Sequence, residues 1–234
     1  MTSREKTRRN MNIKAKAFLG QAITFLVMAL ALFVPAGTAA WFAAWLYLIL
    51  FSVYSMTITL WLLRHDPGLL EERMGSRPQK AWDKMFIAVL FVVFLVWLGL
   101  MPLDAVRFHW SRMAAWLQLV GAIVLTCSYY IFYLTFRENP YLSGVVRIQR
   151  DRGQTVVSTG PYSYVRHPMY VGAFLYFLGT ALFLGSWYGV LFGPLFAGML
   201  TARAVLEERL LREQLKGYDA YMARVKYRFI PHVW

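Results

Sequence analysis

Long apolar runs alternate with short polar segments along the whole chain. Four uncharged runs each have about the length that a helix needs to cross a bilayer. They cover residues 18–34, 41–63, 85–103 and 113–136. A fifth run, 170–202, is too long for one ordinary span, and Gly185 and Ser186 lie near its middle. The pattern predicts an all-α integral membrane protein with about five membrane segments, the last of them a helical hairpin whose second helix continues past the membrane.

These runs divide the chain into three parts. Residues 1–17 form a basic N-terminus, residues 18–136 hold four transmembrane helices and a polar loop at 64–84, and residues 137–234 hold a second loop, the hairpin and a C-terminal helix and tail. A basic start before an apolar run is also typical of a cleaved leader. This run is long for a leader and more spans follow it, so we expect it to be the first membrane segment.

The basic residues are distributed unevenly between the loops. Of the 25 Lys and Arg residues, 23 lie in the two termini and the two large loops, and only Arg107 and Arg112 lie in the remaining connections. The positive-inside rule therefore places both termini and both large loops in the cytoplasm of a multi-pass protein. The net charge of +13 indicates contact with anionic membrane lipids. We expect no nucleic-acid partner, because no basic patch lies on a soluble domain.

Cysteine and histidine give little support for a metal site. The single cysteine, Cys127, lies in the middle of the fourth run, where we expect a small buried apolar side chain. The four histidines, one of them His167, are not spaced like zinc ligands. We therefore expect no bound metal.

The two large loops are more informative than the spans. The first, 64–84, has an apolar side and is either an interfacial linker or a gate or wall for a substrate. The second contains two short β-prone runs, 145–148 and 155–157, separated by glycine-containing segments. We expect these runs to form a small strand pair over the cytoplasmic mouth, since a loop of this length is usually functional.

The second loop ends in the motif GPYSYVRHPMYVG at residues 160–172. Its Gly-Pro pair predicts a turn, and Pro168 suits the first turn of a helix. The free backbone N–H groups of that helix start favour an anion, and Arg166 and His167 supply further donors. Aromatic and basic residues also anchor spans at lipid headgroups, which is the alternative interpretation.

Two adjacent carboxylates, Glu207 and Glu208, follow the fifth run. A hairpin returns them to the side on which Arg166 and His167 lie, so the four residues together predict a site. The alternative is local, because Glu207 lies four residues after Arg203 and Glu208 four before Arg212, the spacing of ordinary helix-surface ion pairs.

Two segments resemble a known superfamily. The stretch 139–172, NPYLSGVVRIQRDRGQTVVSTGPYSYVRHPMYVG, and the ending EERLLREQLKGYDAYMARVKYRFIP are similar to isoprenylcysteine carboxyl methyltransferases and phospholipid methyltransferases. The resemblance implies S-adenosyl-L-methionine bound in a cytoplasm-facing pocket and a lipophilic acceptor, of prenylcysteine-carboxylate type or a related isoprenoid or lipid. It implies catalytic roles for Arg166 and His167.

The resemblance also implies the other site residues. The implied cofactor-binding residues are Gly160, Pro161, Tyr162, Tyr164, Arg166, His167, Pro168, Tyr170, Gly172, Glu207 and Glu208. By the family pattern Glu208, together with Glu207, would hold the amino acid end of the cofactor. Three residues of the tail match a region that closes the site and are assigned to the substrate: Tyr218, Tyr221 and Arg228.

Two other functions are compatible with the sequence. Membrane sterol or steroid reductases, which use NADPH, share a His-Pro-x-Tyr segment and an ending like that at 227–231, although we would expect Asn where this chain has Met169. The other is a non-enzymatic membrane lipid-binding protein, which would need no ordered cofactor loop. Ligand-dependent stabilisation separates the three functions.

Overall fold

The computed structural model describes residues 3–75 and 81–231, with side chains described from residue 13 onward. All regular elements in these ranges are helical. The helices are α1 (Ser3–Ala36), α2 (Phe42–His65), α3 (Pro67–Met74), α4 (Ala81–Pro102), the π-helix η1 (Leu103–Arg107), α5 (Ala115–Glu138), the 3₁₀ turns η2 (Arg150–Arg152) and η3 (Gly160–Ser163), α6 (Pro168–Phe183), α7 (Trp187–Leu191), α8 (Gly193–Gln214) and α9 (Tyr218–Arg224).

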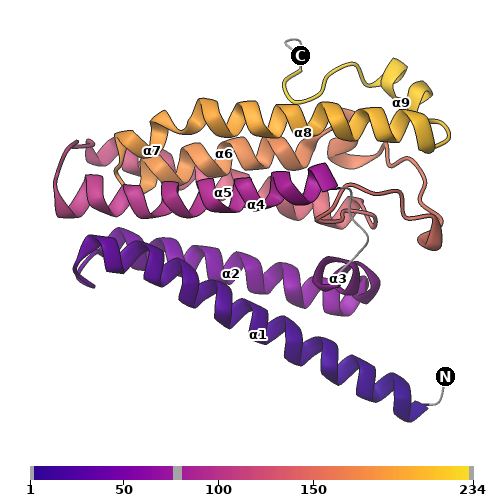
Figure 1. The fold of residues 1–234 in the computed structure, drawn as a ribbon, viewed down its shortest axis with the longest axis horizontal. Coiled ribbons are helices and arrows are strands. Elements are labelled where there is room, and N and C mark those ends of the chain that lie inside the picture. The colour runs from indigo at the N-terminus through magenta and orange to yellow at the C-terminus, as the bar shows by residue number, and fades with distance from the viewer. Residues whose placement is uncertain (1–2, 76–80, 232–234) are drawn as a thin grey trace.

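The long helices lie roughly side by side in two layers, with α1 and α2 in one layer and α4, α5, α6 and α8 in the other (Figure 1). Within the described residues, five helical stretches are long and apolar enough to cross a membrane: Ile13–Ala36, Phe42–His65, Ala81–Arg107, Ala115–Glu138 and Trp187–Gln214. The shorter apolar helix α6 pairs with the last of them. The predicted all-α membrane architecture is therefore confirmed.

The predicted reversal at Gly185 and Ser186 is confirmed. Gly185 has a φ of +80°, a conformation that glycine adopts without a Cβ penalty. The Ser186 hydroxyl accepts a hydrogen bond from the Gly189 N–H at 2.9 Å and so caps the start of α7. The same hydroxyl donates to the buried Asp104 carboxylate at 2.7 Å, which fixes the turn to the start of η1.

Glycines bring α5 and α6 into direct backbone contact. A Cβ at Gly121 would lie 2.4 Å from the Phe183 nitrogen, and one at Gly179 would lie 2.6 Å from the Leu125 nitrogen. Small residues allow this close approach where no water drives helices together. The Ser128 hydroxyl adds a hydrogen bond to the Gly172 carbonyl at 2.9 Å. The pair α5–α6 is therefore a rigid base for the motif that precedes α6.

Two expectations about single segments are wrong. Cys127 is exposed on α5 rather than buried, because an apolar side chain in a membrane helix can face lipid as well as the interior. The runs 145–148 and 155–157 form no strands, although they lie in the described part of the chain. Side-chain bonds to distant helices, described below, hold this loop in place of a β-ladder.

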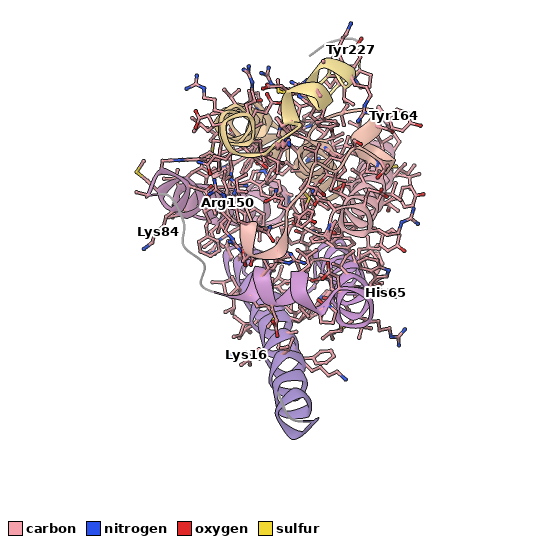
Figure 2. The ribbon with its side chains drawn as sticks, turned by 90° about the vertical axis from the view of Figure 1, so that its right-hand side faces the viewer. Lys16, His65, Lys84, Arg150, Tyr164 and Tyr227 are labelled. Carbon is pink, nitrogen blue, oxygen red and sulfur yellow. The ribbon has the colours of Figure 1, made fainter. Side chains whose placement is uncertain are left out.

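One end of the bundle, which we call the loop end, is formed by α3, the segment 139–167 and α9. Figure 2 looks at this end, where Lys16, Lys84 and Arg150 are found on three different segments. The reversal at Gly185 lies at the opposite end, beside α7 (Figure 1). The chain therefore has one basic end and one end with few charges, as the charge distribution predicted.

Candidate active site

The motif and the tail run alongside each other at the loop end. The Arg166 N–H donates to the Tyr227 carbonyl at 2.9 Å, and the His167 N–H donates to the Arg228 carbonyl at 3.0 Å. Pro168 then starts α6, where its missing N–H leaves no helical bond unmade. These backbone bonds fix the segment before α6 against the end of the chain.

Glu208 is the centre of a buried ionic cluster. Its side chain is only 3% exposed. The Arg166 Nε lies 2.7 Å from Oε1, His167 Nε2 lies 3.1 Å from Oε1, and the Arg228 Nε lies 2.8 Å from Oε2. Both carboxylate oxygens are thereby occupied by the protein itself. The predicted meeting of Arg166 and His167 with a glutamate of α8 is confirmed, and the local Glu208–Arg212 pair is not formed.

The Arg166 guanidinium also ties down the tail. Its Nη1 donates to the Val225 carbonyl at 2.9 Å and to the Lys226 carbonyl at 2.7 Å. A planar fork can serve a carboxylate and two carbonyls at once, which a lysine ammonium on a flexible stem cannot reproduce with the same geometry. Arg166 thus joins α6, α8 and the tail.

Glu207 has a different environment from Glu208. The Tyr170 hydroxyl donates to its Oε2 at 2.8 Å, and Arg203 Nη1 donates to the same hydroxyl at 3.3 Å. Glu207 lines a cavity, whereas Glu208 lies behind its wall. The two adjacent glutamates therefore lie in different environments, and of the two only Glu207 lines the cavity.

This cavity, which we call the loop-end cavity, has a volume of about 370 Å³. The motif, α8, α9, the loop and α3 all contribute to its wall. The predicted site residues that line it are Tyr162, Arg166, His167, Pro168, Tyr170, Glu207, Tyr218 and Tyr221. Apolar side chains such as Val156, Leu210 and Leu211 complete it. It is thus an amphipathic pocket, lined by both charged and apolar side chains.

The tyrosines of this wall are neutral hydrogen-bonding groups. Burial raises the pKa values of Tyr162, Tyr218 and Tyr221 above the usual tyrosine range. Asn139 Nδ2 donates to the Tyr162 hydroxyl at 2.8 Å, and the Tyr221 hydroxyl donates to the Tyr162 carbonyl at 2.8 Å. These bonds connect α9 and the end of α5 to the motif.

Several predicted cofactor residues lie outside the cavity wall. Tyr164 is 72% exposed, and Gly172 packs against Phe132 in the α5–α6 contact. Gly160 has a φ of +55°, and a Cβ there would lie 2.8 Å from the Glu138 carboxylate. Pro161 follows it in η3. The residues of this group shape the turn or the helix packing. Arg228 does not line the cavity and contacts Glu208 behind its wall.

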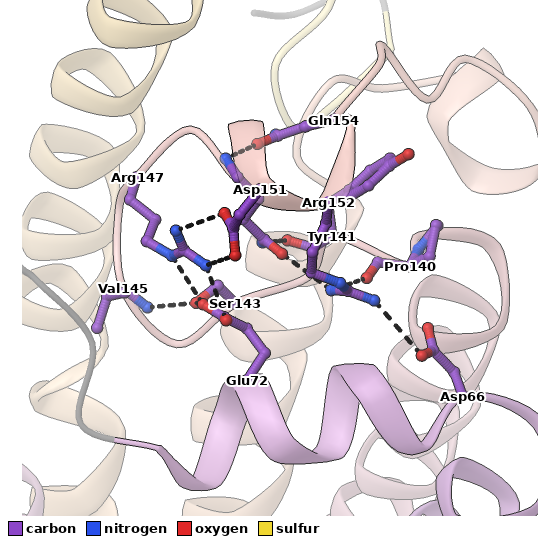
Figure 3. A network of polar contacts seen from close by, with 11 residues as sticks. Asp66, Glu72, Pro140, Tyr141, Ser143, Val145, Arg147, Asp151, Arg152 and Gln154 are labelled. Atoms are coloured by element: carbon purple, nitrogen blue, oxygen red, sulfur yellow. Dashed lines mark hydrogen bonds and ion pairs between the residues drawn. The ribbon is translucent and has the colours of Figure 1, made fainter. Parts of the chain in front are cut away.

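The loop 139–160 is held to α3 by ion pairs (Figure 3). Arg147 Nη2 lies 2.8 Å from Oε2 of the buried Glu72, and Arg152 Nη2 lies 3.4 Å from Asp66 Oδ1. Asp151 accepts from Arg147 on the opposite side at 3.1 Å. These contacts fix the loop to α3, and Arg73 of α3 lines the cavity. Residues 76–80 of the segment 64–84 lie outside the described residues.

Asp83 was missed by the sequence reasoning. It is fully buried at the start of α4, where its Oδ1 accepts from Arg203 Nε at 3.0 Å and its Oδ2 from the Val146 N–H at 2.8 Å. Arg203 Nη2 also donates to the Gly144 carbonyl at 2.9 Å. No sequence signal points to this pair, because Arg203 has Glu207 at the spacing of a local pair and Asp83 is 120 residues away.

A second cavity, the membrane cavity, lies among α1, α2, α3, α5 and α6 and has a volume of about 630 Å³. It is lined mainly by apolar side chains. Gln21 and Ser55 on its wall bond to each other at 2.7 Å and so satisfy their own polar groups. The two cavities share four lining residues, namely Arg73, Leu90, Met169 and Tyr170. The polar pocket and the apolar one therefore meet at a common wall.

Comparison with known proteins bears on this arrangement. Residues 116–217 match the family model of phospholipid methyltransferase. The predicted resemblance is thereby confirmed over α5 to α8, the motif and both glutamates. The matched segment ends before α9 and the tail, and it does not include α1–α4. The residues that close the loop-end cavity from α3 and α4 therefore lie outside it.

Two curated relatives match parts of the chain. Over 85 residues it is 37% identical to Protein-S-isoprenylcysteine O-methyltransferase of Schizosaccharomyces pombe. The matched region is 36% of this chain and 36% of that relative. Over 142 residues it is 28% identical to Delta(14)-sterol reductase of Mus musculus. This matched region is 54% of this chain and 33% of the reductase. The matched regions thus span about a third of the length of these relatives.

Proposed function

We propose that this chain is an integral membrane methyltransferase that uses S-adenosyl-L-methionine and acts on a lipophilic acceptor, of prenylcysteine-carboxylate type or a related isoprenoid or lipid. The observation that carries the proposal is the common wall of the two cavities. A polar pocket that contains the motif residues meets an apolar pocket among the membrane helices at Met169 and Tyr170. A water-soluble cofactor and a lipid can reach such a junction from different sides.

The residues of the loop-end cavity fit this cofactor. Glu207 presents a carboxylate that can accept hydrogen bonds from an ammonium group, while Oε2 keeps its bond from Tyr170. The start of α6 contributes less than the sequence suggested, because Pro168 has no N–H and the N–H groups of Tyr170 and Val171 bond to the His167 carbonyl. Tyrosines and aliphatic side chains supply the flat apolar walls that a nucleoside needs. When bound, the cofactor supplies a methyl group activated by its sulfonium.

The protein's own contribution to the reaction is positioning and the exclusion of water. Arg166 and His167 line the cavity, and their side chains bond to Glu208 and to the tail. These two residues therefore set the shape of the pocket. A carboxylate acceptor needs no general base. An amine acceptor would have to lose a proton, for which the nearest ionisable groups are His167 and Glu207.

Ligand-dependent thermal stabilisation of the purified full chain tests the proposal. S-adenosylhomocysteine is expected to raise the midpoint of thermal unfolding, and NADPH is not. Methyl transfer from labelled cofactor is then measured to prenylcysteine analogues, phosphatidylethanolamine and isoprenoid acceptors. Stabilisation by NADPH alone would instead support the second candidate, a membrane reductase, which the partial match to the sterol reductase favours. Stabilisation by neither ligand would contradict both enzymatic functions.

Glu207→Gln is expected to weaken cofactor binding by roughly 10- to 100-fold, because a charge-assisted contact to a buried group contributes about 1.5–3 kcal/mol. The amide can still accept from Tyr170, so the fold should persist. Titration with S-adenosylhomocysteine measures the change. The matched control is Glu213→Gln, an exposed glutamate of the same helix outside both cavities, which should bind like the parent protein. Equal affinity of the two variants would remove Glu207 from the proposed site.

We further propose that the loop end faces the cytoplasm, on the basis of the charge distribution. Replacing the exposed Cys127 by alanine gives a background without cysteine. Lys216, which follows α8, and Trp187, which starts α7 at the opposite end of the bundle, are then each replaced by cysteine. Each single-cysteine protein is labelled in intact cells with a membrane-impermeant thiol reagent. Labelling is expected only at position 187. Labelling only at position 216 would show the opposite orientation.

A further inference from the structure

The cations of the loop-end cavity differ in whether the protein neutralises them. Four arginines line this cavity. Arg147 pairs with Glu72, Arg166 with Glu208, and Arg203 with Asp83. Arg73 is the fourth, and among the residues that the structure describes no carboxylate lies within ion-pair distance of it.

Arg73 is nevertheless held in a defined position. Its Nη1 donates to the Leu142 carbonyl at 2.9 Å, and its guanidinium lies 4.8 Å from the centre of the Phe136 ring. An arginine carries five N–H donors in a planar fork. The remaining donors are therefore available on a fixed group, which is the arrangement that suits a two-oxygen anion.

The position of Arg73 is the junction of the two cavities. It is one of the four residues that line both, together with Tyr170, whose hydroxyl donates to Glu207. The membrane cavity is lined by two charged side chains, Lys16 and Arg73, and by no carboxylate of the described chain. Its polar residues Gln21 and Thr59 bond to each other at 2.7 Å. The local charge thus favours an anion and disfavours an ammonium group.

We propose that Arg73 determines acceptor specificity by binding a carboxylate attached to an apolar chain that lies in the membrane cavity. The proposal rests on the proposed methyltransferase function and narrows its acceptor from any lipophilic molecule to an anionic one. The guanidinium would hold the carboxylate with one oxygen directed towards the loop-end cavity. Attack by that oxygen would form the ester O–CH₃ bond as the sulfonium C–S bond of the cofactor breaks, so no proton would have to be removed.

The test compares three farnesyl probes that share one tail: N-acetyl-S-farnesylcysteine, its carboxamide, and S-farnesylcysteamine, which carries an amine. Thermal stabilisation of the full chain by each probe is measured in the presence of S-adenosylhomocysteine, and methyl transfer is measured with the carboxylate probe. For the parent protein we expect stabilisation by the carboxylate probe and at least 10-fold weaker binding of the other two.

Arg73→Gln is expected to raise the KM for the carboxylate probe by roughly 10- to 100-fold and to abolish its preference over the carboxamide. Arg73→Lys should restore part of the affinity, because a charge remains without the fork. Arg64→Gln is the matched control, since Arg64 lies at the C-terminal end of α2, is exposed like Arg73, and lines neither cavity. It should keep the parent KM.

The affinity for the cofactor shows whether Arg73 binds the acceptor or only supports the loop. Arg73 also holds the loop through Leu142, and a loosened loop would weaken S-adenosylhomocysteine together with the acceptor. We expect cofactor affinity to stay within about twofold of the parent, so that only acceptor binding changes. A loss of cofactor affinity with an unchanged KM for the carboxylate probe would overturn the proposal, as would a parent protein that binds the amine best. If the parent bound neither S-adenosylhomocysteine nor any probe, the methyltransferase function itself would fail.

Discussion

Glu208→Gln is expected to destabilise the protein by about 3 kcal/mol or more, since removal of one partner of a buried ionic cluster leaves the others uncompensated. Arg166, His167 and Arg228 all contact this one carboxylate. A glutamine offers one carbonyl oxygen and one NH₂ group. The oxygen can accept from some of these donors, but the NH₂ group would face the others as a second donor. The cluster also joins α6, α8 and the tail, and its loss should open the loop-end cavity.

The measurement is the midpoint of thermal unfolding of the purified chain, together with S-adenosylhomocysteine affinity. Glu208→Gln should lower both, whereas Glu207→Gln should lower affinity with a much smaller effect on stability. Glu213→Gln is again the control on the same helix. A Glu208→Gln protein as stable as the control would mean that the three cations find other partners, and that the cluster does not hold the tail in place. The family resemblance of the sequence had instead implied that Glu208, together with Glu207, contacts the cofactor directly.

Gly121→Ala is expected to be the most disruptive single-methyl substitution in the helix packing. The added Cβ would lie 2.4 Å from the Phe183 nitrogen and 2.8 Å from the Leu182 carbonyl carbon, both of them backbone atoms that cannot rotate away. Overpacking of this kind costs about 1–3 kcal/mol and here forces α5 from α6. Because α6 carries the motif at its other end, cofactor affinity should fall as well.

Gly198→Ala provides the control, because a Cβ at that position in α8 meets no atom within 4 Å. Both substitutions gain the higher helix propensity of alanine, which contributes up to about 1 kcal/mol in exposed helices. The difference between their thermal midpoints therefore isolates the effect of helix contact. Equal midpoints would show that α5 and α6 can separate at no cost, against the close approach in the structure.

The hydropathy pattern predicted the fold well for a physical reason. Backbone groups in a bilayer have to be satisfied within a helix, so an apolar run of sufficient length specifies its own secondary structure. The reversal at Gly185 followed from the length of the fifth run alone. The strand pair at 145–148 and 155–157 was wrong, because β-propensity depends on partners, and here bonds to α3, α4 and α8 fix the loop instead.

The candidate site was predicted in outline and changed in detail. The sequence predicted that Arg166 and His167 would meet Glu207 and Glu208; both bond to Glu208, whereas Glu207 bonds to Tyr170. Tyr164 and Gly172 were included because they belong to the same motif, but one is exposed and the other packs between helices. A short motif shows which residues are close in the chain and not which way each side chain points.

The sequence by itself thus determined the number of membrane segments, the hairpin and the end of the bundle at which the charged motif lies, because these depend on the length and spacing of apolar runs. Only the tertiary structure decided the ionic partners. Arg203 bonds to Asp83 and Arg166 to Glu208 across separations of 120 and 42 residues, although some of these residues have local partners at helical spacing. Those choices depend on how each helix is rotated and crossed against its neighbours. The same packing places no carboxylate of the described residues within ion-pair distance of Arg73, at the wall that the two cavities share.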